Sequence, residues 1–147
     1  MRLCSACLLG IKCRYDGKDN LNKKIVAISK KETLIPVCPE QLGGQSTPRP
    51  NAEISGGDGS GVLDGKAKVI EPGGNDVTKY FVKGAEEVLK MAKLHDIKEV
   101  ILTQRSPSCG SGQIYDGTFS KKLIKGDGVT TALLKRNKIK VISDSDL

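Results

Sequence analysis

Apolar and polar residues follow two different periods along this chain, and the changes of period predict its secondary structure. Four short apolar, β-branched runs predict strands, at residues 2–6, 33–38, 99–103 and 139–142. Three segments place apolar residues at helical spacing, at residues 20–31, 77–92 and 127–136. The run at 99–103 is typical of a parallel strand buried on both faces. Because strands alternate with helices, we expect an α/β fold, a three-layer Rossmann-like sandwich with a mostly parallel sheet.

The segments between these elements carry weaker signals. Pro36 lies inside the second predicted strand and indicates a sheet edge or a strand terminus, because proline cannot donate a ladder hydrogen bond. Glycine, proline and serine dominate residues 41–65, which predicts one long loop. Residues 66–70 alternate in polarity and are expected to pair with residues 62–63 across an Asp64-Gly65 turn. Asn75 and Asp127 are the expected caps of the last two helices.

Length and charge narrow the class of protein. A chain of 147 residues is expected to form a single domain, residues 1–147. The net charge of +7 favours an anionic substrate or a phosphate backbone, but the lysines are scattered and predict no dedicated nucleic-acid arm. We find neither a signal peptide nor a membrane-spanning stretch, so a cytoplasmic protein with reduced thiols is expected.

Three of the five cysteines end short motifs that follow predicted strands: Cys7 in SACLLG, Cys38 in VCPE and Cys109 in SPSCG. The carboxyl ends of parallel strands meet at one edge of a sheet, so these thiols are expected to form a soft-metal site. Three thiolates can hold three irons of a cubane cluster and leave the fourth iron open. The spacing alone does not choose iron over zinc. The competing interpretation is that each cysteine is a small buried hydrophobe.

The other two cysteines have different expected roles. A strand at residues 2–6 points Cys4 and Cys7 to opposite faces, so Cys4 is expected to be a core thiol rather than half of a CxxC pair. Cys13 lies in a loop that can approach the same site. It is either a residue that lines the site or a fourth ligand, and the sequence does not decide between them.

Two oxygen-bearing side chains accompany the cysteine motifs. Glu40 follows Cys38 by two residues, where a carboxylate can activate water or move a proton, although it can equally be a solvated loop residue. Ser106 precedes Cys109 by three residues and is expected either to face the same pocket or to hydrogen-bond the backbone of its turn. The only histidine, His95, ends a predicted helix and is expected at the surface.

Taken together, the motifs resemble those of the small desulfidases of the thiouracil desulfidase (TudS) family. The likeness covers nearly the whole chain, and any single motif is weak. The motifs are SACLLG at 5–10, RYDG at 14–17, VCPEQLGG at 37–44, PRP at 48–50, SPSCG at 106–110, YDGTF at 115–119 and GDGVT at 126–130.

The resemblance implies a [4Fe-4S] cluster on Cys7, Cys38 and Cys109, with Glu40 and Ser106 as catalytic residues. It implies hydrolysis of a C=S bond without net redox change, on a small thiolated nucleobase, nucleoside or nucleotide, with thiolated tRNA as a less favoured substrate. The alternative from a different class is a non-catalytic metal or redox module that holds a structural zinc ion or iron-sulfur cluster. An open coordination position distinguishes the enzyme from the structural module.

Overall fold

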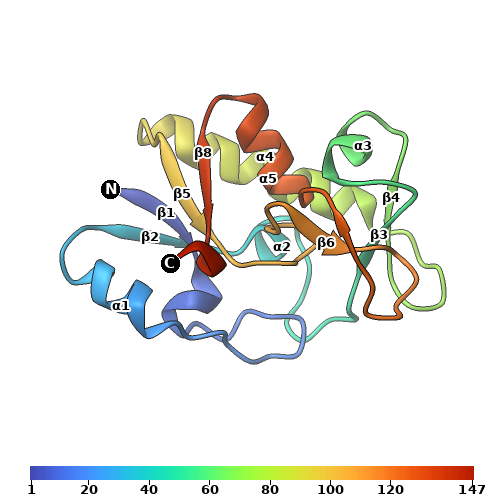
Figure 1. Cartoon of the computed structure of the whole chain (residues 1–147), viewed down its shortest axis with the longest axis horizontal. Helices are drawn as coiled ribbons and strands as arrows, with labels where there is room; N and C mark the ends of the chain where they lie inside the picture. Colours follow the sequence, from blue (N-terminus) through green and yellow to red (C-terminus); the bar gives the residue numbers. More distant parts are fainter.

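The computed structural model describes all residues from 1 to 147, and its strands form one parallel sheet and two small antiparallel ribbons (Figure 1). The strands are β1 (Arg2–Ser5), β2 (Leu34–Val37), β3 (Glu53–Ser55), β4 (Lys68–Ile70), β5 (Glu99–Leu102), β6 (Gln113–Tyr115), β7 (Leu123–Lys125) and β8 (Lys140–Ser143). The α-helices are α1 (Lys23–Ser29), α2 (Pro39–Leu42), α3 (Gly59–Leu63), α4 (Thr78–Leu94) and α5 (Val129–Arg136). Two 3-10 helices complete the list, η1 (Ala6–Leu9) and η2 (Asp144–Asp146).

The parallel sheet has the order β2-β1-β5-β8 and separates two layers of helix (Figure 1). On one face Val88 of α4 and Leu134 of α5 pack against the strands, and on the other Ile25 of α1 packs against Cys4. The predicted α/β fold is therefore confirmed. Strand β2 lies at the edge of the sheet, as its proline predicted. No helix combines the length and apolar composition that a bilayer span requires.

The expectation of one long loop over residues 41–65 is wrong. This segment contains the end of α2, all of β3 and all of α3. Residues 62–63 lie in α3, and β4 pairs antiparallel with β3 instead, with Glu53 opposite Ile70. The β6–β7 ribbon was also not expected. Elements of three to five residues are too short to display a period, so their pairing depends on tertiary contacts.

Neither predicted helix cap forms. Asn75 donates its side-chain amide to Glu71 (2.8 Å), and the first turn of α4 is bonded by Asp76, which accepts the backbone N–H of Thr78 (2.9 Å). Asp127 accepts from Lys135 instead of capping α5. The first N–H groups of α5 donate to backbone carbonyls of the 107–110 loop, which leaves no donor for a side-chain cap.

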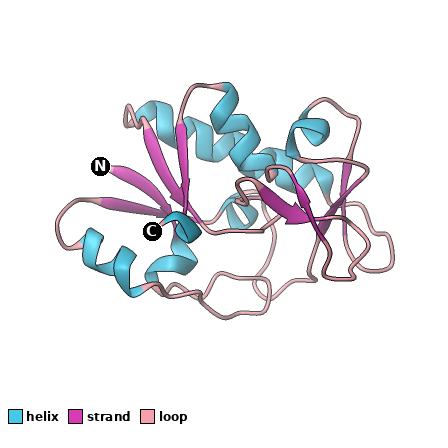
Figure 2. Ribbon diagram, viewed as in Figure 1, coloured by secondary structure: helices cyan, strands magenta, loops and turns pink.

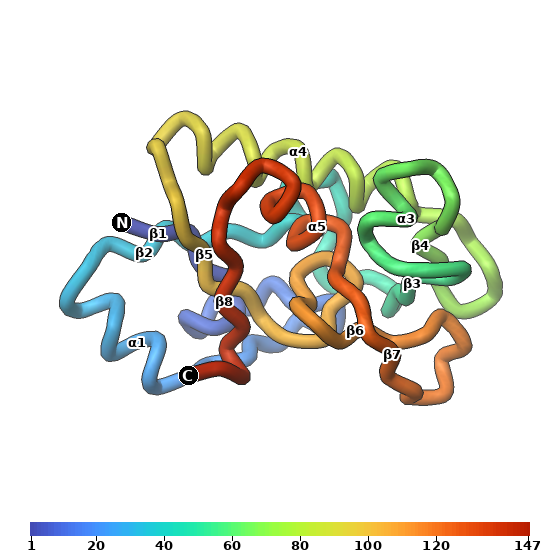
Figure 3. The backbone as a smooth tube through the Cα atoms, turned by 45° about the horizontal axis from the view of Figure 1, so that its top comes forward, coloured from blue at the N-terminus to red at the C-terminus, as the bar shows by residue number.

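Helix α2 lies very close to α4 because both carry a glycine at their contact. A Cβ on Gly43 would lie 2.0 Å from the carbonyl oxygen of Tyr80, and a Cβ on Gly84 would lie 2.0 Å from that of Pro39. This close packing places α2 at the carboxyl edge of the parallel sheet. The two ribbons and α3 stand opposite that edge, around their own apolar cluster (Figures 2 and 3).

Candidate active site

A cavity of about 640 Å³ lies at the carboxyl ends of β1, β2 and β5, the position where open α/β sheets bind ligands. Its walls come from the loops that follow these strands and from the two ribbons. The walls contain every residue predicted for the site: Cys7, Cys38, Cys109, Glu40 and Ser106. The structure thus brings the five residues together, while their roles as ligands and catalysts stay predictions.

Each cysteine is placed by the element that begins or ends beside it. Cys7 lies in η1, the turn that directly follows β1. Cys38 directly follows β2 and is the N-cap residue of α2. Pro39 then occupies the first helical position, where a backbone N–H would have no partner within the helix. Cys109 lies in the loop after β5. Since β1 is flanked by β2 and β5, the three loops are neighbours.

The loop that carries Cys109 is held on both sides. The Oγ of Ser106 accepts the backbone N–H groups of Ser108 and Cys109, both at 3.0 Å. Thr131 of α5 donates its hydroxyl to the Cys109 carbonyl at 2.8 Å. A Cβ on Gly128 would lie 2.5 Å from the Ser108 carbonyl oxygen, so the start of α5 packs directly on this loop. The Cys109 backbone is therefore fixed before any ligand binds.

These bonds also restrict what Ser106 can do. A hydroxyl has two lone pairs and one proton, and both lone pairs of Ser106 are directed at backbone N–H groups. The residue lines the cavity, so its O–H remains available to donate a hydrogen bond. Both expected roles of Ser106, turn partner and pocket residue, are thus found together.

The pKa values of three cysteine thiols in the cavity wall, those of Cys13, Cys38 and Cys109, are raised above the ordinary thiol value. The pKa of Cys38 is raised, first by its contact with Cys13 and then by burial. Burial raises the pKa of Cys109 to about 12. Cys13 has a pKa of about 11, because the lowering effect of Cys38 is outweighed by Cys7 and burial. A metal that binds here must displace these protons, as it does at cysteine sites in general.

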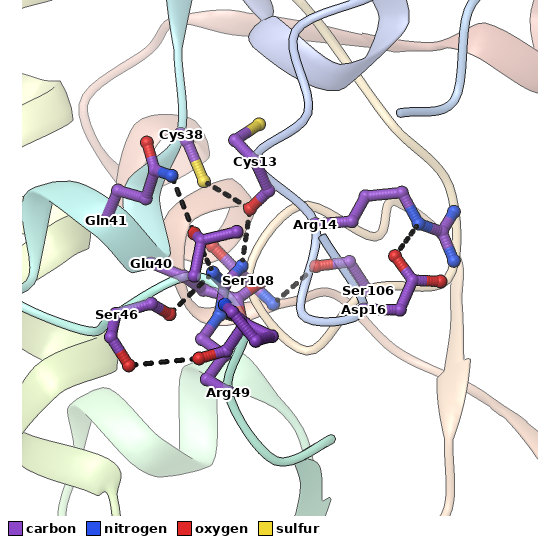
Figure 4. Close-up of polar contacts among 12 residues, drawn as sticks. Cys13, Arg14, Asp16, Cys38, Glu40, Gln41, Ser46, Arg49, Ser106 and Ser108 are labelled. Atoms are coloured by element: carbon purple, nitrogen blue, oxygen red, sulfur yellow. Dashed lines mark hydrogen bonds and ion pairs between the residues drawn. The ribbon is translucent and has the colours of Figure 1, made fainter. Parts of the chain in front are cut away.

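Glu40 is held by a buried arginine that the sequence motifs did not identify as functional. The Nε of Arg49 donates to the Glu40 carboxylate at 3.1 Å (Figure 4). The other guanidinium nitrogens donate to the Cys13 carbonyl (2.9 Å) and to Ser46 and Thr47. Burial raises the pKa of Glu40, while the charges of Arg49 and Arg14 oppose that rise. The carboxylate is therefore oriented and partly shielded from water.

Known proteins share this architecture over the full chain. A sequence model of the 2-thiouracil desulfurase family matches residues 3–146. The chain belongs to the 2-thiouracil desulfurase family. It is also similar to an uncharacterized protein, YbbK, of Bacillus subtilis strain 168, at 50% identity over all of this chain and 97% of that protein. The solved structure of the [4Fe-4S]-dependent thiouracil desulfidase TudS matches with a TM-score of 0.86 and 39% identity, over 99% of this chain and 91% of that one. The family resemblance read from the motifs is confirmed.

Of the two remaining cysteines in this family member, one lies in the core and the other lines the cavity. Cys4 is fully buried in the core between the sheet and α1, and burial raises its pKa to about 12, which confirms the expected core position. Cys13 lines the cavity, and its carbonyl accepts from both Cys38 and Arg49. Its place in the site is established, while ligation by its thiol stays a prediction. His95 is exposed at the end of α4, as expected.

We expect Arg49→Met to lower the free energy of unfolding of the protein by about 3 kcal/mol. The substitution leaves a largely buried carboxylate without its cation and a buried carbonyl without its donor. Urea denaturation under anaerobic conditions measures this change. The matched control is Arg136→Met, which breaks an ion pair with Asp64 whose side chains are 41% and 47% exposed. That pair should contribute less than about 1 kcal/mol, and equal losses in the two variants would contradict the buried role of Arg49.

Proposed function

We propose that this protein is a [4Fe-4S]-dependent desulfidase that hydrolyses the C=S bond of a small thiolated nucleobase, nucleoside or nucleotide. The observation that carries the proposal is the convergence of three thiols, a carboxylate and a hydroxyl on one cavity. Membership of the 2-thiouracil desulfurase family and the likeness to TudS support the same chemistry. The reaction adds the oxygen of water to the carbon and releases sulfide, so no net electron transfer occurs.

Cys7, Cys38 and Cys109 would hold the cluster. They fit it because all three are free thiols on the cavity wall, and thiolates are the ligands that iron-sulfur clusters use. The family match and the likeness to the [4Fe-4S]-dependent TudS support the cluster, and no observation favours the zinc alternative. When bound, the cluster would supply an iron that accepts the substrate sulfur and polarises the C=S bond.

Glu40 and Ser106 would handle the protons and the orientation of the substrate. Glu40 is held at a fixed angle by Arg49, which suits a base that takes a proton from the attacking water or returns one to a ring nitrogen. Ser106 has only its proton free, so it would donate a hydrogen bond to a substrate heteroatom and would not act as a base. The enclosing walls would limit the access of other water molecules.

The rest of the cavity wall suits a heteroaromatic ring with an anionic substituent. Three of the chain's five phenylalanine and tyrosine side chains line it, namely Tyr15, Tyr115 and Phe119. Three further cationic side chains line it, namely Arg14, which also pairs with Asp16 at 3.4 Å, Arg105 and Lys121. Aromatic faces stack on bases, and cations attract phosphate, so the wall supports a base or nucleotide as substrate.

We expect sulfide release from thiouracil, thiouridine or its phosphate to exceed release from thiolated tRNA under equal anaerobic conditions. A cavity of this size encloses a single base without unstacking a folded RNA. The measurement is sulfide formed per minute for each substrate, at several salt concentrations. Reaction with thiolated tRNA alone, with a rate that falls steeply as salt increases, would show that phosphate-backbone contacts govern recognition and would contradict the small substrate.

A cytoplasmic location belongs to this proposal. All five cysteines are free, and a reducing compartment keeps thiols available for an iron-sulfur cluster.

A further inference from the structure

A second carboxylate, Glu53, lines the cavity without a cationic partner. It begins β3, is only 5% exposed, and shares the cavity wall with one other carboxylate, Glu40. Glu40 is paired with Arg49, whereas Glu53 has no lysine, arginine or histidine within ion-pair distance. A buried carboxylate is costly unless hydrogen bonds satisfy its oxygens, so the partners of each oxygen of Glu53 are informative.

The two oxygens of Glu53 differ. Oε1 accepts the backbone N–H groups of Gly117 (3.0 Å) and Phe119 (3.1 Å), in the turn that joins β6 to β7. Oε2 accepts no hydrogen bond from the chain. It nevertheless keeps some accessible surface, because it is not one of the inaccessible polar atoms that lack a partner. Because the side chain lines the cavity, Oε2 is an acceptor open to whatever occupies it.

The anchored turn brings an aromatic ring to the same wall. Phe119 adopts a φ of +57°, in the left-handed region that a bulky side chain rarely occupies, and its N–H is one of the two that Glu53 holds. Gly117 packs so closely on β3 that a Cβ there would lie 2.5 Å from the Ile54 carbonyl oxygen. An unusual backbone held by several contacts at a cavity is a common sign of function.

We infer that Glu53 is a specificity-determining residue: its free Oε2 accepts a hydrogen bond from a ring N–H of the thiolated base, whose face contacts Phe119. This inference rests on the proposed function and adds a chemical requirement, an N–H donor on the substrate ring. Thiouracil carries two such donors, and methylation of a ring nitrogen removes one. A site with a buried acceptor rejects an analogue that lacks the matching donor, because the acceptor is left unpaired.

The test compares binding of uracil, 1-methyluracil and 3-methyluracil to anaerobic holoprotein by calorimetry. These ligands carry no sulfur and are not turned over. In Glu53→Gln, the amide oxygen still accepts from Gly117 and Phe119, but an NH₂ donor replaces the free acceptor. We expect this variant to bind uracil about 10- to 100-fold more weakly. For one of the two methylated ligands, wild type and variant should bind equally weakly, which identifies the ring N–H that Glu53 accepts.

Two further variants separate hydrogen bonding from shape and charge. Glu86→Gln makes the same charge change on the exposed face of α4 and should leave all three affinities unchanged. Phe119→Leu should weaken all three ligands by a similar factor, because it removes a contact with the ring face. An equal loss for all three ligands in Glu53→Gln, or no loss, would overturn the inference, as would the absence of uracil binding to the wild type.

If the circular dichroism spectrum of Glu53→Gln differs from that of the wild type, the variant is misfolded and a crystal structure provides the test instead. A crystal structure of wild-type holoprotein with uracil should place a ring nitrogen within hydrogen-bond distance of Oε2, and a separation beyond 4 Å, roughly the upper limit for such a contact, would overturn the inference. Sulfide release by the wild type is assayed separately. If uracil binding depends on Glu53 as expected but no sulfide is released, the proposed function is contradicted and the role of Glu53 stands. If sulfide is released but uracil binding does not depend on Glu53, the proposed function stands and the role of Glu53 is contradicted.

Discussion

Replacing Cys7, Cys38 or Cys109 by serine is expected to leave a colourless protein, whereas the wild type prepared anaerobically is brown. Each of the three thiols comes from a different segment around the cavity, so when one is lost the other two cannot take its position. A serine hydroxyl is a poor ligand for iron compared with a thiolate. The measurement is the visible spectrum with iron and sulfide counts for each variant, followed by exposure of the wild type to air, which should bleach an open cluster.

Cys4→Ala is the matched control, because Cys4 lies in the core under α1 and does not line the cavity. It should keep full iron content, and cluster loss equal to that of the three serine variants would move the site to another cysteine set. Stoichiometric zinc in a colourless wild type would contradict the cluster altogether. The same counts on Cys13→Ser decide its role, since unchanged iron places it on the cavity wall and lost iron makes it a fourth ligand.

Glu40→Gln is expected to lower the rate of sulfide release by about a hundredfold or more while the cluster and the fold are retained. The glutamine oxygen can still accept from Arg49, so the geometry of the pair is kept and the proton-accepting charge alone is lost. Single-turnover sulfide release under anaerobic conditions, together with the cluster spectrum, measures the two effects separately.

Two further variants serve as comparisons for Glu40→Gln. Glu86→Gln, on the exposed face of α4, should show wild-type turnover, and normal turnover in Glu40→Gln would remove Glu40 from the mechanism. Ser106→Ala should lose less activity than Glu40→Gln, because a hydrogen-bond donor orients the substrate but does not move the proton. It should also loosen the Cys109 loop, whose backbone N–H groups lose their acceptor.

The sequence predicted the parallel sheet because its strands and long helices obey simple periodicity. The apolar run at 99–103 became β5, a central strand, and the spacing at 77–92 became α4. Once parallel strands are predicted, their carboxyl ends must share an edge, so the meeting of Cys7, Cys38 and Cys109 followed from sequence position. The cysteine spacing did not distinguish iron from zinc, and it was the family motifs that indicated a [4Fe-4S] cluster.

Tertiary structure alone decided the rest of the cavity wall. The β3–β4 and β6–β7 ribbons are three residues per strand, too short for a period, and the caps of α4 and α5 depend on loops that are distant in sequence. Arg49 reaches Glu40 across nine residues, and Glu53 reaches Phe119 across sixty-six. A hydrogen bond between distant residues leaves no local pattern, because neither side chain's own neighbours reveal its partner. The sequence by itself therefore determined where the three thiols and the Glu40 carboxylate lie, and only the folded chain determined what holds that carboxylate and what forms the rest of the cavity wall.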